Sequence, residues 1–305
     1  MRVNNLNLPY VLIIIAAIIW GTSFVAVRWG LEYLHPTIFA FLRFTLASLI
    51  FLPFALKKFK NIKQLLLTKA IIAIGFFNSL AFICQFIGQQ FTTAGKSSLF
   101  VNFYIIIVPL VAPLFLKEKY SWKVLVSAVI GFVGVFFVTT NLNFQQIAEG
   151  TVKGDLITLG SGIGWTFYII ITKRFLDKNE KISVLELFFG TTLWTSLFLA
   201  LVLPFGIVGQ TIEGITAQFT WQAITALLYL SCFCTIGAFI LYVYGLKLAN
   251  AGESSILLLI EVLVSFTLEG FVYKEIPAIW TIVGSVMILF AVVLNSVQFK
   301  LIKRN

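Results

Sequence analysis

The chain has 305 residues, of which 60% are hydrophobic and only 11% are charged, and its mean hydropathy is +1.01. A soluble domain carries about 25% charged residues; this chain has too few charges to cover a water-facing surface, so we expect most of it to lie in lipid. The net charge of +10 is spread over the gaps between hydrophobic runs, which excludes a basic patch for nucleic acid.

Ten hydrophobic runs are each long enough to cross a bilayer, for which a helix needs about 20 residues. In chain order they are 9–30, 37–57, 65–91, 97–117, 121–140, 154–173, 183–208, 221–247, 252–272 and 277–298. Polar connections such as His35-Pro36 separate them. The first run is longer than a signal-peptide core, so we expect it to be a retained helix. The sequence predicts an all-α integral membrane protein with ten transmembrane helices.

The basic residues predict the orientation of these helices, because lysine and arginine collect in cytoplasmic loops. If both termini are cytoplasmic, most of the 22 basic residues lie inside, including the cluster from Lys57 to Lys69. Only Arg28, Lys96, Lys153 and Lys274 then lie on the other side, and Arg43 lies inside the second span. We therefore expect a multi-pass protein of the cell (inner) membrane with cytoplasmic N- and C-termini.

The two halves of the sequence resemble each other. The equivalent segments, in the same order in each half, are Trp20 and Trp165, Pro53-Phe54 and Pro204-Phe205, Ala94–Leu99 and Ala251–Ile256, and Lys117-Glu118 and Lys274-Glu275. A shared order with nearly constant spacing indicates a duplication.

Each half contains five predicted spans, an odd number, so the second copy enters the membrane in the opposite direction. We expect two inverted five-helix repeats, residues 1–145 and 146–305, around a central cavity. In transporters of this kind the substrate binds near the middle of the membrane, between the repeats. A duplicated scaffold without a transport role is the alternative.

Several motifs carry a family resemblance. They are Trp20–Phe24, Arg43-Phe44, Ala94–Ser98, Pro109 and Lys117-Glu118 in the first half, and Gly252–Ser255, Glu261 and Lys274-Glu275 in the second. In this order the chain resembles the EamA family of the drug/metabolite transporter superfamily over nearly its whole length. The resemblance implies a ten-helix permease with a central cavity that moves small metabolites such as amino acids. The family often has proline after the position of Glu261, where this chain has Val262, so the resemblance leaves a helix break there open.

Glu261 is the strongest candidate for a functional residue. It lies near the middle of the ninth span, where a charge costs about 2.5–3.5 kcal/mol on insertion scales. Apolar surroundings favour the neutral carboxyl, so we expect Glu261 to exchange a proton or to bind a cationic group. The alternative is a neutral side chain that is hydrogen-bonded between helices.

Arg43 is a second charge inside a span. Its forked donors suit a substrate carboxylate, but an arginine in this position can also brace a neighbouring loop or extend to the membrane interface.

Further polar and aromatic side chains are expected to line the cavity. They are Trp20, Thr22, Ser23, Asn78, Gln85, Gln89, Asn102, Tyr104, Trp165, Tyr168 and Tyr242. Asn78, Gln85 and Gln89 share one helix face by their spacing. Polar groups in a membrane helix face protein or water and not lipid. The alternative to lining the cavity is therefore that these side chains hydrogen-bond between helices.

Two other features have a structural interpretation. Lys96–Ser98 and Glu253–Ser255 are typical of turns and helix N-caps. The 32 phenylalanines are expected to face lipid or to fill the protein core.

The sequence favours a secondary transporter that works by alternating access, since it contains no nucleotide-binding motif. We expect a proton-coupled or facilitative exporter of amino acids or related amphipathic solutes, with membrane lipid and protons as the other partners, as a monomer or homodimer. An intramembrane lipid-modifying enzyme is an alternative, but one histidine and few acidic residues give a poor catalytic inventory. A channel is a second alternative. We expect no enzyme activity, no cofactor and no metal site, and the three cysteines are expected to be inert.

Overall fold

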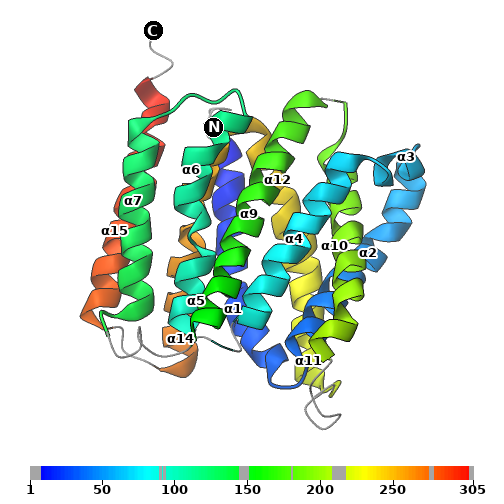
Figure 1. The fold of residues 1–305 in the computed structure, drawn as a ribbon, viewed down its shortest axis with the longest axis horizontal. Helices are drawn as coiled ribbons and strands as arrows, with labels where there is room; N and C mark the ends of the chain where they lie inside the picture. Colours follow the sequence, from blue (N-terminus) through cyan, green and yellow to red (C-terminus); the bar gives the residue numbers. More distant parts are fainter. Residues whose placement is uncertain are drawn as a thin grey trace, which may run out of the picture.

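The computed structural model describes residues 8–88, 91, 94–143, 151–179, 181–207, 218–274 and 278–301. Within these ranges the protein consists of helices and short connections, without a strand (Figure 1). The helices are α1 (Leu8–Leu31), α2 (Pro36–Lys58), α3 (Ile62–Leu66), α4 (Lys69–Gly88), α5 (Ala94–Val101), α6 (Tyr104–Phe115), α7 (Trp122–Thr140), α9 (Val152–Lys178), α10 (Val184–Ile207), α11 (Trp221–Tyr229), the π-helix η2 (Leu230–Gly237), α12 (Ala238–Leu248), α13 (Ala251–Leu257), α14 (Ile260–Tyr273) and α15 (Ile279–Leu301).

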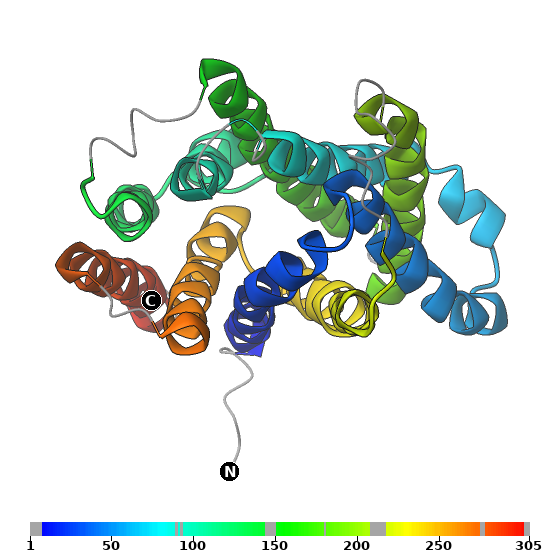
Figure 2. The same ribbon diagram turned by 90° about the horizontal axis from the view of Figure 1, so that it is seen from below.

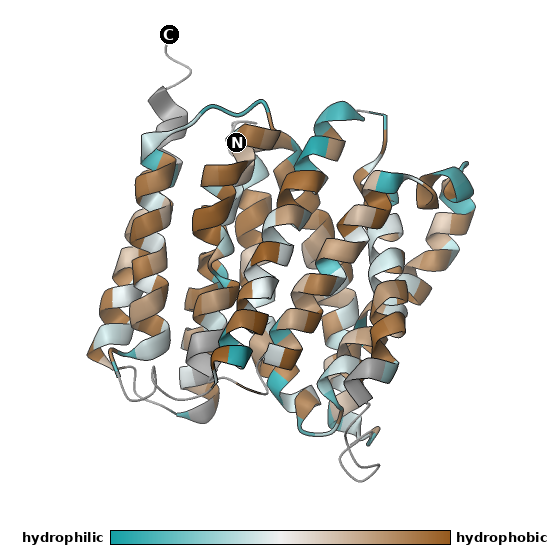
Figure 3. Ribbon diagram, in the orientation of Figure 1, coloured by the Kyte–Doolittle hydropathy of each residue, from teal (hydrophilic) through white to brown (hydrophobic). Residues whose placement is uncertain are grey.

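Nine helical segments of the described chain are long and apolar enough to cross a membrane. They correspond to the first nine predicted spans. The tenth predicted span corresponds to α15, whose apolar stretch Ile279–Asn295 is shorter. Hydrophobic residues run along the helices and hydrophilic ones gather towards their ends (Figure 3), as expected for helices that cross lipid. The predicted boundary between residues 145 and 146 lies outside the described residues.

The helices form two facing rows (Figure 2). One row contains α7, α6, α9, α4 and α10, and the other contains α15, α14, α1, α12 and α2. At one end of the rows α7 packs on α15, and at the other end α2 packs on α10. The start of α1 and the end of α15 lie at the same edge of the bundle, the upper edge in Figure 1.

Local sequence signals set several helix ends. Pro36 occupies the first turn of α2, where its missing N–H is not needed. Thr151 caps α9 by accepting a hydrogen bond from the Gly154 N–H (3.1 Å). Ser183 and Glu186 form a reciprocal capping box at the start of α10, as their spacing predicts.

Three of the predicted spans are interrupted. The fourth breaks between α5 and α6, the ninth breaks between α13 and α14, and the eighth contains η2. At the ninth-span break the Leu259 N–H bonds the Ile256 carbonyl (3.1 Å) and the Glu261 N–H bonds the Leu258 carbonyl (3.0 Å). These bonds span three residues and tighten the chain locally. The break therefore forms without the proline that the related motif often has after Glu261.

The two repeated motifs form short helices and not turns, but N-cap chemistry is present at Glu253, which accepts hydrogen bonds from Asn250, the residue that precedes α13. Residues 94–101 form α5 and Ala251–Leu257 form α13, so the Lys-Ser-Ser and Glu-Ser-Ser segments lie within short helices. In α13 the Ser254 hydroxyl donates to the Asn250 carbonyl (2.7 Å) and the Ser255 hydroxyl to the Gly252 carbonyl (2.8 Å). Their hydroxyls are satisfied inside the helix, which is the other common use of serine in membrane helices.

Candidate functional site

A cavity of about 300 Å³ lies between the two rows of helices. Its wall contains Trp20, Ser23, Phe24, Val27, Arg43, Phe82, Gln85, Phe86, Ser98, Val101, Asn102, Tyr104, Thr139, Trp165, Phe239, Leu258, Glu261, Val262, Ser265 and Phe266. These residues come from both halves of the chain. They extend from the middle of the bundle towards the end where α1 and α4 finish, the lower end in Figure 1.

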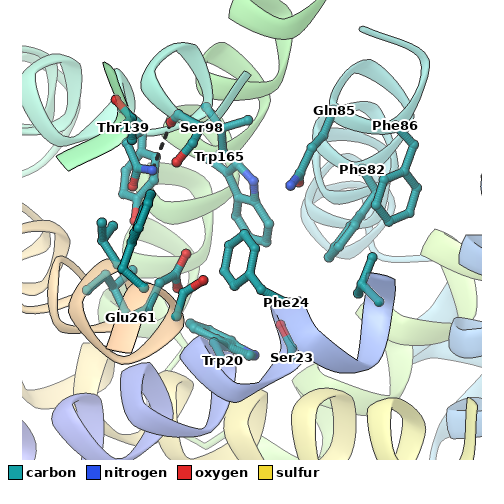
Figure 4. A pocket seen from close by; sticks show the side chains of 18 of the residues that line it. Trp20, Ser23, Phe24, Phe82, Gln85, Phe86, Ser98, Thr139, Trp165 and Glu261 are labelled. Atoms are coloured by element: carbon teal, nitrogen blue, oxygen red, sulfur yellow. Dashed lines mark hydrogen bonds between the residues drawn. The ribbon is translucent and has the colours of Figure 1, made fainter. Parts of the chain in front are cut away.

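Glu261 reaches the cavity from the first turn of α14, directly after the helix break. Figure 4 shows its carboxylate directed into the space between Trp20 and Phe24. It makes no hydrogen bond to any residue within the described part of the chain. A carboxylate held in this way on a discontinuous helix has the position of a ligand-binding group in transporters.

Arg43 reaches the same cavity from α2 and is only 4% exposed. Its Nε donates to the Thr235 Oγ1 (2.8 Å), and its guanidinium carbon lies 5.3 Å from the Phe82 ring centroid and 5.5 Å from that of Phe44. Arg43 and Glu261 are both described and form no ion pair with each other. Among the described residues, no group accepts a hydrogen bond from the two terminal nitrogens of Arg43, so these donors are available to a ligand.

Aromatic rings form much of the wall. Trp20 meets Phe239 edge-on at 4.9 Å between centroids, and Trp165 meets Phe82 edge-on at 5.4 Å. Trp20 is fixed because its Nε1 donates to the Cys234 carbonyl (2.8 Å), which belongs to the π-helix η2. The walls can therefore hold an apolar group between rigid rings.

Amide and hydroxyl groups add polar positions to the cavity. The Gln85 amide points into it from α4 (Figure 4). Asn102 lies at the break after α5, where its Nδ2 donates to the Ser98 carbonyl (2.9 Å) and its buried Oδ1 has no partner among the described residues. Such groups fix the orientation of a bound polar molecule.

The opposite end of the bundle is closed by side chains at the start of α13. The Tyr10 hydroxyl donates to Glu253 Oε2 (3.0 Å), and the Asn295 amide donates to the Glu253 carbonyl (3.2 Å). Glu118, in the connection after α6, accepts a hydrogen bond from the Ala251 N–H at 2.7 Å. Burial raises the pKa of Glu118 above its usual value, although this hydrogen bond opposes the shift.

Lys173 completes this closed end. Its Nζ lies 2.9 Å from Asp177 Oδ1 and donates to the Lys247 carbonyl at 3.3 Å. These contacts join α9 to the end of α12, so the cavity does not extend to this edge of the bundle.

The model of the EamA-like transporter family matches residues 7–140 and 152–297. The chain belongs to this family. The assignment confirms the resemblance drawn from the motifs, and with the nine membrane-length helices of the described residues it makes the chain a multi-pass membrane protein of a transporter family.

Relatives of this EamA-like transporter carry transporter names. A protein of Archaeoglobus fulgidus named as an uncharacterized transporter is 25% identical over 95% of this chain and 97% of the relative. The transporter YoaV of Bacillus subtilis, also named as uncharacterized, is 23% identical over 94% of this chain and 96% of the relative. A crystal structure with 15% identity has a TM-score of 0.77 and covers 97% of this chain and 98% of that chain; at this identity the likeness concerns the fold alone.

In this EamA-like transporter, eight of the thirteen expected site residues lie in the cavity wall: Trp20, Ser23, Arg43, Gln85, Asn102, Tyr104, Trp165 and Glu261. Gln89 lies outside the described residues. Thr22 instead contacts the Tyr229 hydroxyl on α11. Asn78, Tyr168 and Tyr242 lie behind the wall, on the closed side.

The sequence reasoning missed the phenylalanines of the cavity. Phe24, Phe82 and Phe239 line it, although phenylalanine was expected to face lipid or to fill the core. One signal was available: counted back from Ala94 and Ala251, Phe82 and Phe239 occupy equivalent positions in the two halves.

Proposed function

We propose that this protein is a secondary carrier for small zwitterionic metabolites, amino acids or related amphipathic solutes. The observation that carries the proposal is that one cavity holds an arginine and a glutamate that are not paired with each other. Arg43 would bind a carboxylate through its two terminal nitrogens, as guanidinium groups commonly do. Glu261 would bind an ammonium group.

The aromatic walls complete this recognition. An ammonium group interacts favourably with the face of an aromatic ring, and Trp20 and Phe24 flank the Glu261 carboxylate (Figure 4). An apolar side chain of the solute would lie against Trp165 and Phe82. The amides of Gln85 and Asn102 would orient its polar atoms.

We further propose that residues 1–145 and 146–305 are inverted repeats. Helix contacts support this, since each pairing recurs when the halves are exchanged: α1 packs on α12 as α9 packs on α4, and α1 packs on α14 as α9 packs on α6. The two segments matched by the family model also agree with two copies.

Side-chain pairs repeat in the same way. The Trp20–Phe239 pair has its counterpart in Trp165–Phe82. Thr45 and Ser196 precede Pro53 and Pro204 by equal intervals, and their hydroxyls hydrogen-bond to each other at 2.6 Å. A contact between equivalent residues is expected on a two-fold axis.

Alternating access follows from this symmetry. The cavity extends towards one end of the bundle, and Glu118, Lys173 and Glu253 close the other. Exchange of the two conformations of the halves would reverse this arrangement. We propose export as the direction and proton exchange at Glu261 as the coupling, because its carboxyl reaches the cavity without a cationic partner among the described residues.

Tracer flux in proteoliposomes tests the proposal. A thermal-shift screen of amino acids against the purified protein first selects a solute, since a bound ligand stabilises what it binds. Glu261→Gln should then lower flux driven by a proton gradient at least tenfold (about 1.4 kcal/mol), whereas the same change in the capping box, Glu186→Gln, should leave it unaltered.

Arg43→Lys should raise KM about tenfold, because lysine cannot form the forked pair of hydrogen bonds that a guanidinium group makes to a carboxylate. Arg174→Lys is the exposed control.

Two results would contradict the carrier, and two others would change only its mechanism. Flux without saturation or counterflow would indicate a channel, and a chemically altered solute would indicate an enzyme. Full activity of Glu261→Gln would remove its proposed role. Flux that saturates but ignores the proton gradient would leave a facilitative carrier in place of a coupled one.

A further inference from the structure

A second, much smaller void lies on the closed side of the cavity. It measures about 10 Å³ and is lined by Asn78, Tyr168, Thr172, Leu187, Phe188, Thr191, Thr192, Phe239 and Val243. These residues come from α4, α9, α10 and α12. Phe239 belongs to the wall of both spaces, so its ring stands between the void and the cavity.

Three buried oxygen atoms in the lining residues lack a partner. They are Asn78 Oδ1, Thr172 Oγ1 and Thr191 Oγ1, and each makes no hydrogen bond within the described chain. The exposed fractions of the three residues are 1%, 1% and 5%. Polar atoms as deeply buried as these are nearly always hydrogen-bonded, to protein or to ordered water.

Neighbouring threonines in the same two helices do have hydrogen-bond partners. Thr195 in α10 donates to the Thr191 carbonyl (2.8 Å), and Thr166 in α9 donates to the Gly162 carbonyl (2.8 Å). This bond to the preceding turn is the usual solution for a buried threonine in a helix. Thr172 and Thr191 lie in the same two helices and do not use it.

We propose that the void binds one water molecule that joins α4, α9 and α10. Its volume is near the lower limit for a single water, and a buried water typically makes about three hydrogen bonds. Asn78 Oδ1 accepts, and each threonine hydroxyl can donate or accept, so one water satisfies all three atoms. Among the described residues no carboxylate lines the void, so a cation there would carry an uncompensated charge.

The position of this water also bears on transport, and this step rests on the proposed function. The path out of the cavity on the closed side must offer polar groups to a polar solute. The water site lies directly behind Phe239 and supplies them. Movement of the Phe239 ring would join the two spaces, so the water marks where the passage continues.

Threonine-to-valine variants test the water, because valine has the shape of threonine without the hydroxyl. With a bound water, Thr172→Val and Thr191→Val should each lower the Tm of the purified protein by about 2–4 °C. The double variant should lower it by less than the sum, because both hydroxyls bind one molecule. Thr225→Val, at an exposed threonine that bonds its own helix, is the control.

Changes in Tm of the opposite sign would contradict a bound water in this void. In a dry void the hydroxyls are unsatisfied, and either valine should raise Tm. Strictly additive losses would exclude a shared ligand. A sodium-dependent rise in Tm that the variants lose would identify a cation in place of water.

Cysteine accessibility tests the passage separately. Thr191→Cys is introduced after Cys84, Cys232 and Cys234 are replaced by alanine, and a small thiol reagent is added from the closed side. Its reaction should accelerate several-fold during solute turnover, while Leu199→Cys, buried in the same helix, should not change. Unchanged reactivity of Thr191→Cys in protein that still transports would overturn the passage but not the carrier. The Tm measurements need no solute and stand in either case.

Discussion

Glu118 links the two halves through a single carboxyl. It lies in the connection after α6 and accepts a hydrogen bond from the Ala251 N–H at the start of α13 (2.7 Å). Burial is the largest influence on it and raises its pKa. Ionised Glu118 therefore carries a cost of desolvation. The hydrogen bonds from backbone N–H groups and the charge of nearby Lys173 offset only part of this cost.

Glu118→Gln should consequently stabilise the protein more at high pH than at low pH. Glutamine keeps the acceptor oxygen and has no charge. Below the usual carboxyl pKa of about 4.3 the native Glu118 is protonated in both the folded and unfolded states, so the two proteins should have similar Tm. As pH rises through the raised pKa, the native protein alone bears the cost of ionisation. The difference in Tm between variant and native protein should thus grow from pH 4 to pH 8.

Thermal unfolding in detergent at both pH values measures this difference. Glu186→Gln, in the α10 capping box, provides the same chemical change without the contact to α13. A difference that stays constant or shrinks as pH rises would mean that burial does not dominate at Glu118.

Charged residues were the most predictable part of the site. Glu261 and Arg43 stand out in sequence because any charge inside an apolar run needs a reason, and both lie in the cavity wall. Thr22 and Ser23 show the limit. They are adjacent in sequence, yet Ser23 lines the cavity while Thr22 faces Tyr229. Composition cannot tell which side of a helix faces a cavity when every side is apolar.

At the scale of helices, α7 and α15 pack with almost no space between their backbones. A Cβ added to Gly284 would lie 2.5 Å from the Gly134 carbonyl oxygen and 2.8 Å from Val138 Cγ2. Backbone cannot move away as a flexible side chain can, so the two helices would have to separate. Small residues at such contacts are common in membrane helix packing.

Gly284→Ala should therefore destabilise the protein by about 1–3 kcal/mol, which corresponds to a fall in Tm of several degrees. Gly237→Ala is the matched control, because its nearest neighbour would be the Cys232 carbonyl oxygen at an ordinary 3.6 Å. That variant should be neutral or slightly stabilising, since alanine favours helix more than glycine. Equal Tm values for both variants would contradict the close packing.

The sequence predicts where the helices lie, but it does not predict where they are interrupted. Hydropathy locates the nine membrane-length segments, because lipid demands long apolar runs. The breaks at Asn102-Phe103 and Leu258-Leu259 and the π-helix η2 lie inside these apolar segments. Only hydrogen bonding distinguishes them, and neither break contains a proline or glycine that would have indicated it.

For the molecule as a whole, the arrangement of the basic residues predicts the orientation. The end of α2, the start of α3 and their connection lie at the same edge as the start of α1 and the end of α15 (Figure 1). Together they carry Lys57, Lys58, Lys60 and Lys63. The connection before α11 lies at the opposite edge, where the Gln218 N–H bonds the Tyr33 carbonyl (3.0 Å). The positive-inside rule predicts that the lysine-rich edge lies in the cytoplasm.

Single cysteines at the two edges test this orientation. In a background without native cysteines, Phe219→Cys should react with a membrane-impermeant thiol reagent in intact cells, because Phe219 is 60% exposed and lies at the edge that is predicted to face outside. Lys60→Cys should react only after permeabilisation. Labelling of Lys60→Cys alone in intact cells would reverse the orientation and place the cavity end on the cytoplasmic side. Equal labelling of both would show that the lysine clusters do not select one orientation, and a fixed direction of export would then have no structural basis.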